Sequence, residues 1–208
     1  MLYLVNTPWW IKKWVYPHYR WSMPGHEKKI YLSFDDGPHP EATTFVLDEL
    51  KKFNALATFF CIGKNVAAWP SLYARILSEG HAAGNHTQHH LNGWKTNDKQ
   101  YFDDIIAASK YIDSKLFRPP YGRITRFQAK QAADKMGFTI VMWSVLSADF
   151  DTAITPQKCW INVKRATRNG SVVVFHDSEK AMERMKYALP QTLAYFSKQG
   201  FSFEKLPG

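Results

Sequence analysis

The chain has 208 residues and a formal net charge of +9 at pH 7, with 45% hydrophobic and 22% charged residues. This composition excludes a disordered, collagen-like or coiled-coil protein and predicts one globular domain. The positive charge favours anionic partners, but it is spread too evenly for the basic stripe of a nucleic-acid-binding protein, so we expect no nucleic-acid partner.

The first 21 residues are aromatic and basic, and Pro8, Lys12 and Pro17 interrupt every apolar stretch. These interruptions leave no apolar core long enough for a signal peptide. No later segment reaches the roughly 18 apolar residues of a membrane span. The aromatic and basic first 21 residues could rest on a membrane interface, but we expect residues 1–28 to be an arm packed on a catalytic domain of residues 29–208.

Along the rest of the chain, short apolar runs alternate with segments of helical period, a pattern typical of repeated β-α units with parallel strands. We expect seven strands, at 30–34, 57–62, 82–85, 115–118, 139–144, 171–175 and 201–204. We expect helices between them, at 41–53, 71–79, 98–115, 126–135, 156–168 and 181–198. Polar residues follow several strand ends, which in parallel α/β proteins meet at the rim where sites are built.

Two adjacent carboxylates follow the first predicted strand, in the segment SFDDGP. An Asp-Gly pair is common in turns. A turn needs only one Asp, however, and two adjacent anions repel each other unless a cation or an arginine offsets them. We therefore interpret Asp35 and Asp36 as functional residues that point to different sides of the strand tip.

His86 and His90 are four residues apart in the segment HTQHH. On a helical turn, this spacing places both imidazoles on one face, within reach of one metal ion. Eight histidines in the chain would also produce such a spacing by chance. Together with a carboxylate from another strand tip, the pair would supply two nitrogens and one oxygen and leave positions open for water and substrate, as in catalytic metal sites.

Two later segments carry further candidates. The segment RPPYG, which begins at Arg118, is either a structural loop or a rigid turn that fixes one backbone N–H for a developing oxyanion. His176 follows the apolar run SVVVF, so we expect it to titrate rather than to pack in the core. Asp149 could orient this imidazole, although a lone Asp in a loop is commonly just solvated.

In chain order, these four segments and the stretch around Asp149 resemble the polysaccharide deacetylase family. This family is also described as the chitin-oligosaccharide deacetylase homology domain and as carbohydrate esterase family four. The resemblance extends over about residues 29–204. It implies a single α/β domain with the fold of a distorted (β/α) barrel with fewer than eight strands, which agrees with the seven predicted parallel strands.

The resemblance also implies a role for each matching residue in the first two motifs. Asp35 matches the catalytic base of the family's F-D-D-G motif, and Asp36 matches the metal-binding carboxylate. His86 and His90 match the two histidine ligands of the H-[ST]-x-x-H motif.

The later motifs supply the remaining implied roles. Arg118 matches the arginine that holds the base carboxylate, and Tyr121 matches the residue whose backbone N–H helps to form the oxyanion hole. His176 resembles the general acid, and Asp149 resembles the acidic residue that tunes it.

The sequence departs from the family pattern at two places. The D-x-x-D-W stretch reads LSADF, so Leu146 replaces the first Asp and Phe150 replaces Trp. Val174 replaces the leucine of L-x-H. The family surrounds the acetyl methyl group at these places, so Phe150 and Val174 are candidate substrate-binding residues. The departures put the acyl pocket in question more than the reaction type.

The implied activity is hydrolysis of N-acetyl groups on N-acetylglucosamine units of a peptidoglycan- or chitin-like polymer. Metal-activated water would attack, with Asp35 as base and His176 as acid. We expect one divalent ion, zinc first, with cobalt or nickel as alternatives. The substrate class suggests the cell envelope, whereas the missing signal favours the cytoplasm. We expect no stable membrane insertion, and the sequence does not identify protein partners.

Three other functions remain open at this point. The same scaffold supports O-acetyl esterases that act on acetylated xylan. A non-catalytic sugar-binding relative would have lost the base, the acid or a ligand, and none is lost here. An iron oxygenase could use two histidines and one carboxylate, but it would need a redox cosubstrate site, for which the sequence has no motif.

Overall fold

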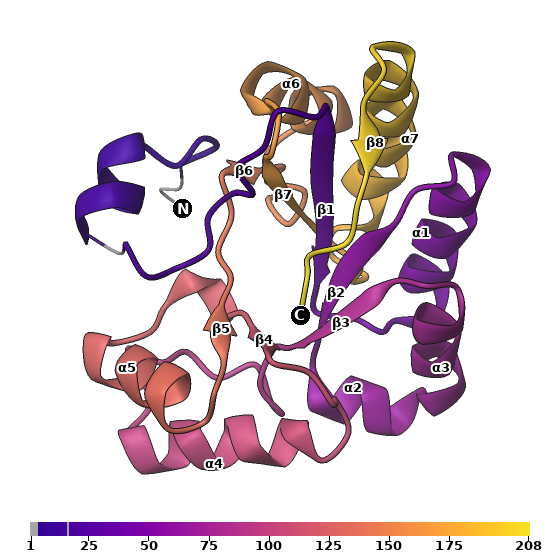
Figure 1. Ribbon diagram of the computed structural model, residues 1–208. Helices are drawn as coiled ribbons and strands as arrows, with labels where there is room; N and C mark the ends of the chain where they lie inside the picture. Colours follow the sequence, from indigo (N-terminus) through magenta and orange to yellow (C-terminus); the bar gives the residue numbers. More distant parts are fainter. Residues whose placement is uncertain (1–3, 16) are drawn as a thin grey trace.

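A curled sheet of parallel strands forms the centre of the computed structural model, which describes residues 4–15 and 17–208 (Figure 1). Seven strands follow the order β5-β4-β3-β2-β1-β7-β6, and β8 pairs with β1 off this path. The strands are β1 (Lys29–Asp35), β2 (Ala57–Cys61), β3 (Ala82–Asn85), β4 (Leu116–Phe117), β5 (Thr139–Ile140), β6 (Val145–Leu146), β7 (Val172–His176) and β8 (Ser202–Phe203). The sheet is a half-barrel, which confirms the predicted distorted (β/α) barrel of a single domain.

Seven α-helices connect and cover the described strands. They are α1 (Pro40–Lys52), α2 (Gly63–Ala68), α3 (Pro70–Ser78), α4 (Asp98–Ser109), α5 (Arg126–Asp134), α6 (Pro156–Ala166) and α7 (Met182–Lys198). Prolines at the first helical positions and side-chain caps at Thr125 and Thr155 fix several starts. Helix α2 was not predicted, because it has only six residues. Helix α4 ends at Ser109, six residues before the predicted end. Ser114 lies in the connection to β4, where its Oγ accepts the Leu116 N–H.

The predicted strand at 139–144 is wrong as a single element, because the chain leaves the sheet between β5 and β6. The carbonyls of Val141 and Met142 accept hydrogen bonds from the Arg118 guanidinium, at 3.2 and 3.1 Å. The Met142 N–H donates to the Arg20 carbonyl at 2.8 Å. These backbone groups therefore have partners other than a neighbouring strand, and the edge of the half-barrel opens there.

The main hydrophobic core lies between the sheet and the helices α1, α3 and α7, which share one side of it (Figure 1). At its centre, the ring of Phe34 stacks on those of Phe59 and Phe175, with centroids 5.1 and 6.1 Å apart. All three rings are fully buried. Because they come from the adjacent strands β1, β2 and β7, this stack fixes the relative positions of the three longest parallel strands.

A second, smaller apolar cluster is closed by the C-terminal tail. Leu206 is 1% exposed and packs with Phe60, Leu116, Val141 and Val172. Its N–H donates to Thr58 Oγ1 at 2.9 Å. The tail therefore contributes a core residue to the half-barrel.

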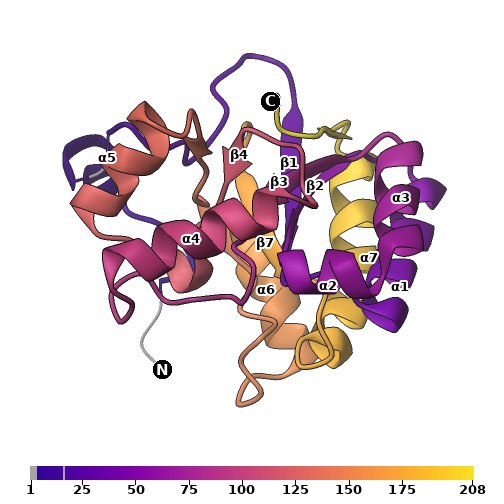
Figure 2. The ribbon, with the colours of Figure 1, turned by 90° about the horizontal axis from the view of Figure 1, so that it is seen from below.

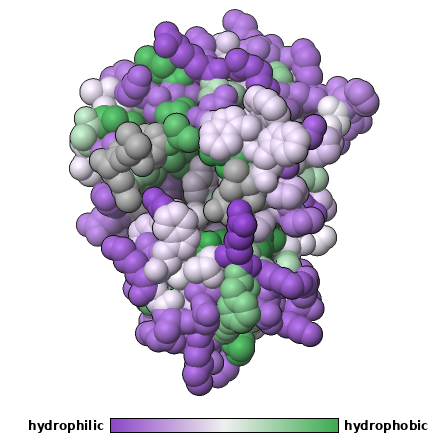
Figure 3. Space-filling model, turned by 90° about the vertical axis from the view of Figure 1, so that its left-hand side faces the viewer, coloured by the Kyte–Doolittle hydropathy of each residue, from purple (hydrophilic) through white to green (hydrophobic). Residues whose placement is uncertain are grey.

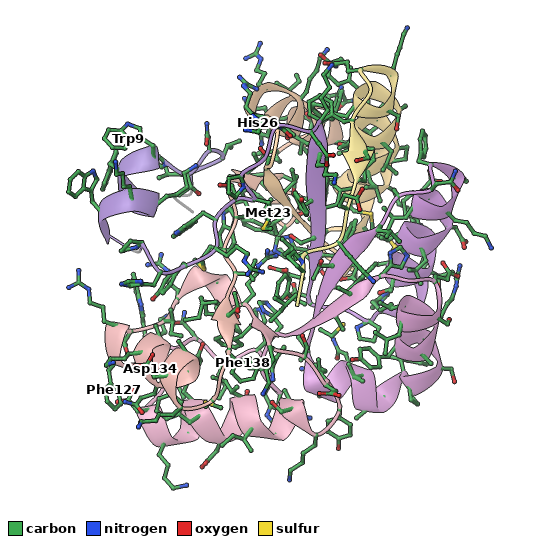
Figure 4. All side chains as sticks on the ribbon, viewed as in Figure 1. Trp9, Met23, His26, Phe127, Asp134 and Phe138 are labelled. Carbon is green, nitrogen blue, oxygen red and sulfur yellow. The ribbon has the colours of Figure 1, made fainter. Side chains whose placement is uncertain are left out.

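The N-terminal arm runs along the open edge of the half-barrel. Arg20 bridges to Val141 next to β5, and Asn6 bridges to Val145 of β6. Trp21 is buried in a cluster with Phe117. The large hydrophobic side chains that the described part of the arm exposes are those of Leu4, Trp9, Trp10 and Trp14. Figure 3 shows large pale side chains among hydrophilic ones on this face, and Figure 4 shows Trp9 on the outer side of the arm. The division at residue 28 stays a prediction.

Across the described ranges 4–15 and 17–208, the helices are all too short or too polar to cross a bilayer.

Replacement of Leu206 by alanine should lower the free energy of unfolding by about 2–3 kcal/mol, because it leaves a cavity in the small core cluster. The control is Leu77→Ala, since Leu77 is 47% exposed and its loss should cost less than about 0.5 kcal/mol. Urea denaturation measures both values. Equal stabilities of the two variants would show that the tail does not contribute to the core.

Candidate active site

The candidate residues converge at the carboxyl ends of the strands, where helices α2 and α4 lie nearest the viewer in Figure 2. Asp35 ends β1 and Asp36 follows it, His86 follows β3, and His176 ends β7. In register, Asp35 pairs with His176 across β1 and β7. The parallel sheet therefore brings together residues that are up to 141 positions apart in the sequence.

Asp36, His86 and His90 form a cluster whose ligand atoms all lie within 4.8 Å of one another. Asp36 Oδ1 lies 3.1 Å from His90 Nε2 and 3.7 Å from His86 Nε2. It is buried and has no hydrogen-bond partner. A buried oxygen without a partner, facing two imidazole nitrogens, fits a divalent cation, since such an ion would bind all three atoms.

The expectation that His86 and His90 share a helical turn is wrong. Residues 86–90 form an irregular loop, in which Thr87 and His90 have φ values of 64° and 59°. These left-handed residues turn the chain, so that the two imidazole centroids are 5.0 Å apart. The four-residue spacing therefore brings the two rings together through backbone turns rather than through helical periodicity.

The second nitrogen of His86 fixes the orientation of its ring. His86 Nδ1 lies 2.7 Å from the carbonyl oxygen of Arg118, which can only accept, so Nδ1 carries the proton and Nε2 presents its lone pair to the cluster. Burial lowers the pKa of His86 to about 4. The imidazole is thus neutral at physiological pH, as a metal ligand must be.

Asp36 is held as an anion in the cluster. Its backbone has a φ of 81°, and its carbonyl accepts a hydrogen bond from Asn65 Nδ2 at 2.7 Å. Burial by itself would raise the pKa of Asp36, but the imidazole of His90, followed by those of His176 and His86, holds it well below its usual value. An ionised carboxylate beside two imidazoles is a set of groups that could hold a divalent cation.

Asp35 forms a buried ion pair with Arg118. Arg118 Nη1 donates to Asp35 Oδ1 at 2.6 Å and to Ser33 Oγ at 2.9 Å. Arg118 is fully buried, and its guanidinium carbon lies 4.0 Å from the centroid of the Phe60 ring. Burial lowers the pKa of Arg118, yet a guanidinium stays protonated in proteins. The pair leaves one Asp35 oxygen for other chemistry.

His176 is paired with Asp149, as the sequence suggested. Asp149 accepts two hydrogen bonds of 2.7 Å, one from the His176 backbone N–H and one from its Nδ1. Burial lowers the pKa of His176, but the charge and hydrogen bond of Asp149, with smaller effects of Asp36 and Asp35, outweigh it and raise the pKa to about 9. Arg184 Nε donates to the Asp149 carbonyl at 2.7 Å and so supports its loop. The imidazole is therefore an acid at neutral pH.

Tyr121 lies in the 3-10 turn η2 (Pro120–Gly122), with a φ of 60°. The hydrogen bonds of this turn are donated by Gly122 and Arg123, so the Tyr121 N–H takes no part in them. The Tyr121 ring contacts that of His90 edge-on, with centroids 4.5 Å apart. The side chain of Tyr121 therefore lies beside the metal cluster.

The two candidate substrate-binding residues differ in exposure. The ring of Phe150 meets that of His176 edge-on at 5.2 Å and is half-buried. Val174 is 1% exposed, in register with Leu146 on the neighbouring strand β6. Leu146 and Val174, which both depart from the family pattern, are thus direct neighbours. The substrate-binding role of Phe150 and Val174 stays a prediction.

Two buried carboxylates that support the site were missed. Asp104, on α4, accepts the backbone N–H groups of Gln88 and His89 at 3.0 and 2.9 Å, and it pairs with His89 Nδ1 at 2.6 Å. It therefore fixes the loop that carries His86 and His90. In the sequence, Asp104 is one of several acidic residues of a helix, and nothing marks it.

The second missed carboxylate is Asp177, which directly follows His176. It accepts hydrogen bonds from Thr43 Oγ1 at 2.5 Å and from the Gly37 N–H at 3.1 Å. A Cβ atom on Gly37 would lie only 2.0 Å from an Asp177 oxygen, so this position requires glycine. Burial, in spite of the Thr43 hydrogen bond, raises the pKa of Asp177 to about 8. The segment FHD contained the only signal for this residue.

Comparisons with known proteins agree with this geometry. The sequence model of the polysaccharide deacetylase family matches residues 22–141. A peptidoglycan-N-acetylglucosamine deacetylase of Bacillus cereus is 34% identical over 97% of this chain and 74% of its own. A chitooligosaccharide deacetylase of Azorhizobium caulinodans is 32% identical over 88% of this chain and 94% of its own.

Among solved structures, the Bc1960 peptidoglycan N-acetylglucosamine deacetylase, in complex with 4-naphthalen-1-yl-N-oxidanyl-benzamide, superimposes with a TM-score of 0.87. The two chains are 34% identical, and the match covers 97% of this chain and 95% of the other. The similarity thus extends over the half-barrel and the N-terminal arm alike.

Replacement of Asp104 by alanine should lower the affinity for a divalent metal by about 10–100-fold, because the loop of His86 and His90 loses the acceptor of three hydrogen bonds. The matched control is Asp103→Ala, since Asp103 is exposed on the same helix and pairs only with Lys99. Calorimetric titration with zinc compares the two. Equal affinities would show that Asp104 does not support the cluster.

Proposed function

Because the chain belongs to the polysaccharide deacetylase family, we propose that it removes N-acetyl groups from N-acetylglucosamine units of a peptidoglycan- or chitin-like polysaccharide. The observation that carries the proposal is the convergence of three parts: the Asp36, His86 and His90 cluster, the Asp35–Arg118 pair and the His176–Asp149 pair. Each part matches one requirement of amide hydrolysis: an electrophilic centre, a base and an acid.

We infer that Asp36, His86 and His90 bind one divalent ion, with zinc as the best fit to two imidazoles and one carboxylate. Cobalt and nickel accept the same ligands. When bound, such an ion acidifies a water ligand and polarises the acetyl carbonyl. Because the protein would supply only three ligands, positions would remain for water and for the substrate.

Asp35 is the proposed base. Its side chain is held by Arg118 and Ser33 on one side, and it directly precedes the ligand Asp36. The fixed carboxylate can take a proton from the attacking water without reorganising, which reduces the barrier. The Tyr121 N–H is the proposed donor to the oxyanion of the tetrahedral intermediate, and one such donor typically contributes about 2.7–4 kcal/mol.

His176 is the proposed acid. Asp149 orients its ring and keeps it protonated, so that the opposite nitrogen, Nε2, can donate to the leaving amine. An amine needs this proton more than an alcohol does, which favours N-acetyl over O-acetyl substrates. The retained base, acid and ligands also favour an enzyme over a non-catalytic sugar-binding relative.

Asp35→Asn and His176→Ala should each lower the rate of acetate release from N-acetylglucosamine oligomers at least about a hundredfold, the range for general base and acid catalysis. Their metal content should stay near that of the unchanged protein, because neither side chain belongs to the ligand set. Acetate assays and elemental analysis measure the two quantities. A variant that keeps full turnover would exclude that residue from the mechanism.

The same assay tests the metal and the substrate class. Treatment with a chelator should abolish acetate release, and added zinc should restore it. Acetate release from acetylxylan, with none from N-acetylglucosamine oligomers or peptidoglycan, would instead assign an O-acetyl esterase.

The pH profile of kcat/KM should fall on the alkaline side at or below about pH 9, as His176 loses its proton. The raised pKa of His176 keeps its imidazole protonated up to that pH. A bound cation would repel the protonated imidazole and so move the loss of its proton to lower pH. In Asp149→Asn, the main raising charge is gone, so the alkaline fall should move to lower pH. An unshifted profile in this variant would contradict the assigned role of Asp149.

A further inference from the structure

An exposed tryptophan stands next to the site and takes no part in the chemistry described above. Trp94 is 54% exposed and follows the ligand His90 by four residues, which limits the distance between their Cα atoms to roughly 14 Å. Its loop leads into α4 and contacts the segment that follows Tyr121. Trp94 therefore belongs to the same rim as the metal cluster.

The Trp94 side chain is fixed rather than loosely exposed. Its Nε1–H donates to the Ile124 carbonyl at 2.9 Å, and its backbone N–H donates to Asn92 Oδ1 at 3.0 Å. The Arg123 guanidinium lies over the ring, 4.1 Å from its centroid. Because the polar atom is satisfied and one ring face is covered, the exposed area is mainly the other, apolar face of the indole.

The backbone around Trp94 is also tightly packed. The Gly93 N–H donates to the Arg123 carbonyl at 3.1 Å, and the Gly93 carbonyl accepts from Gln128 Nε2 at 3.0 Å. A Cβ atom on Gly93 would lie 2.6 Å from that Arg123 carbonyl. Such a rigid aromatic surface binds a ligand with little loss of conformational entropy.

Arg123 brings an unneutralised charge to this surface. Among the described residues, no carboxylate lies within 4.0 Å of its guanidinium. Asp98, at the start of α4, accepts a hydrogen bond from Gln128 Nε2 instead. The guanidinium edge is therefore free to bind an anion, and Arg is well suited to carboxylates.

We propose that Trp94 and Arg123 form an accessory subsite for a glycan strand that carries carboxylates, as the peptidoglycan strand does. The free indole face stacks on the apolar face of a sugar ring a few units from the acetyl group that is removed. Arg123 pairs with a carboxylate of a neighbouring unit. This inference rests on the proposed deacetylase function and names its substrate class as an anionic rather than a neutral polymer.

The test compares two tetramers with the zinc-loaded protein: a neutral N-acetylglucosamine tetramer and a peptidoglycan tetramer with muramic carboxylates. Trp94→Ala should raise KM for both about tenfold with little change in kcat, and Trp94→Phe should recover most of the loss because it keeps a ring. Arg123→Gln should raise KM about tenfold for the anionic tetramer and less than about twofold for the neutral one. The matched control is Trp14→Ala, which removes an exposed tryptophan of the arm that also lies near a cationic side chain.

The outcomes separate the subsite from the proposed function. If the unchanged protein releases acetate from neither tetramer, the proposed function fails, and the subsite fails with it. If that protein is active and Trp94→Ala keeps its KM, only the subsite is overturned. Loss of zinc from Trp94→Ala would assign Trp94 a purely structural role. Equal effects of Arg123→Gln on both tetramers would overturn the carboxylate contact.

Discussion

The buried ion pair of Arg118 and Asp35 is the interaction on which the site and its scaffold both depend. A buried guanidinium is costly unless its nitrogen atoms have hydrogen-bond partners and its charge is balanced. Arg118 meets this requirement with Asp35, Ser33 and the carbonyls of Val141 and Met142. Its own carbonyl orients His86. Arg118 thus fixes Asp35, His86 and the break in the sheet edge, so its loss would disturb all three.

Backbone conformations with positive φ are concentrated around the candidate site. Six non-glycine residues of the described chain have positive φ, and all but Asn54 lie in or next to the site: Asp36, Thr87, His90, Tyr121 and Ala148. Each such residue costs free energy that the surrounding structure must offset. Buried carboxylates supply part of that support, since Asp104 holds the histidine loop and Asp177 holds the turn at Gly37. These hydrogen bonds hold the segments that carry Asp36, His86 and His90.

The departures from the family pattern lie beside the His176–Asp149 pair rather than on it. Leu146 and Val174 are register partners on β6 and β7, and both are buried. Two residues that depart from the family pattern are therefore neighbours on adjacent strands. Asp149, on the same segment as Leu146, keeps its contact with His176. The His176–Asp149 pair is thus retained beside side chains that depart from the family pattern.

The sequence by itself determined the class of fold, the strands with long apolar runs and the polar residues that meet at the candidate site, because strand periodicity and paired carboxylates or histidines are local signals. It did not determine how the residues meet. The sequence predicts a helical turn at His86 and His90 and a continuous strand after residue 139, because local patterns do not reveal left-handed backbone or the hydrogen-bonding needs of a buried arginine. Asp104 and Asp177 were missed for a similar reason: their partners are backbone N–H groups from distant segments, which only the tertiary structure brings within hydrogen-bond distance.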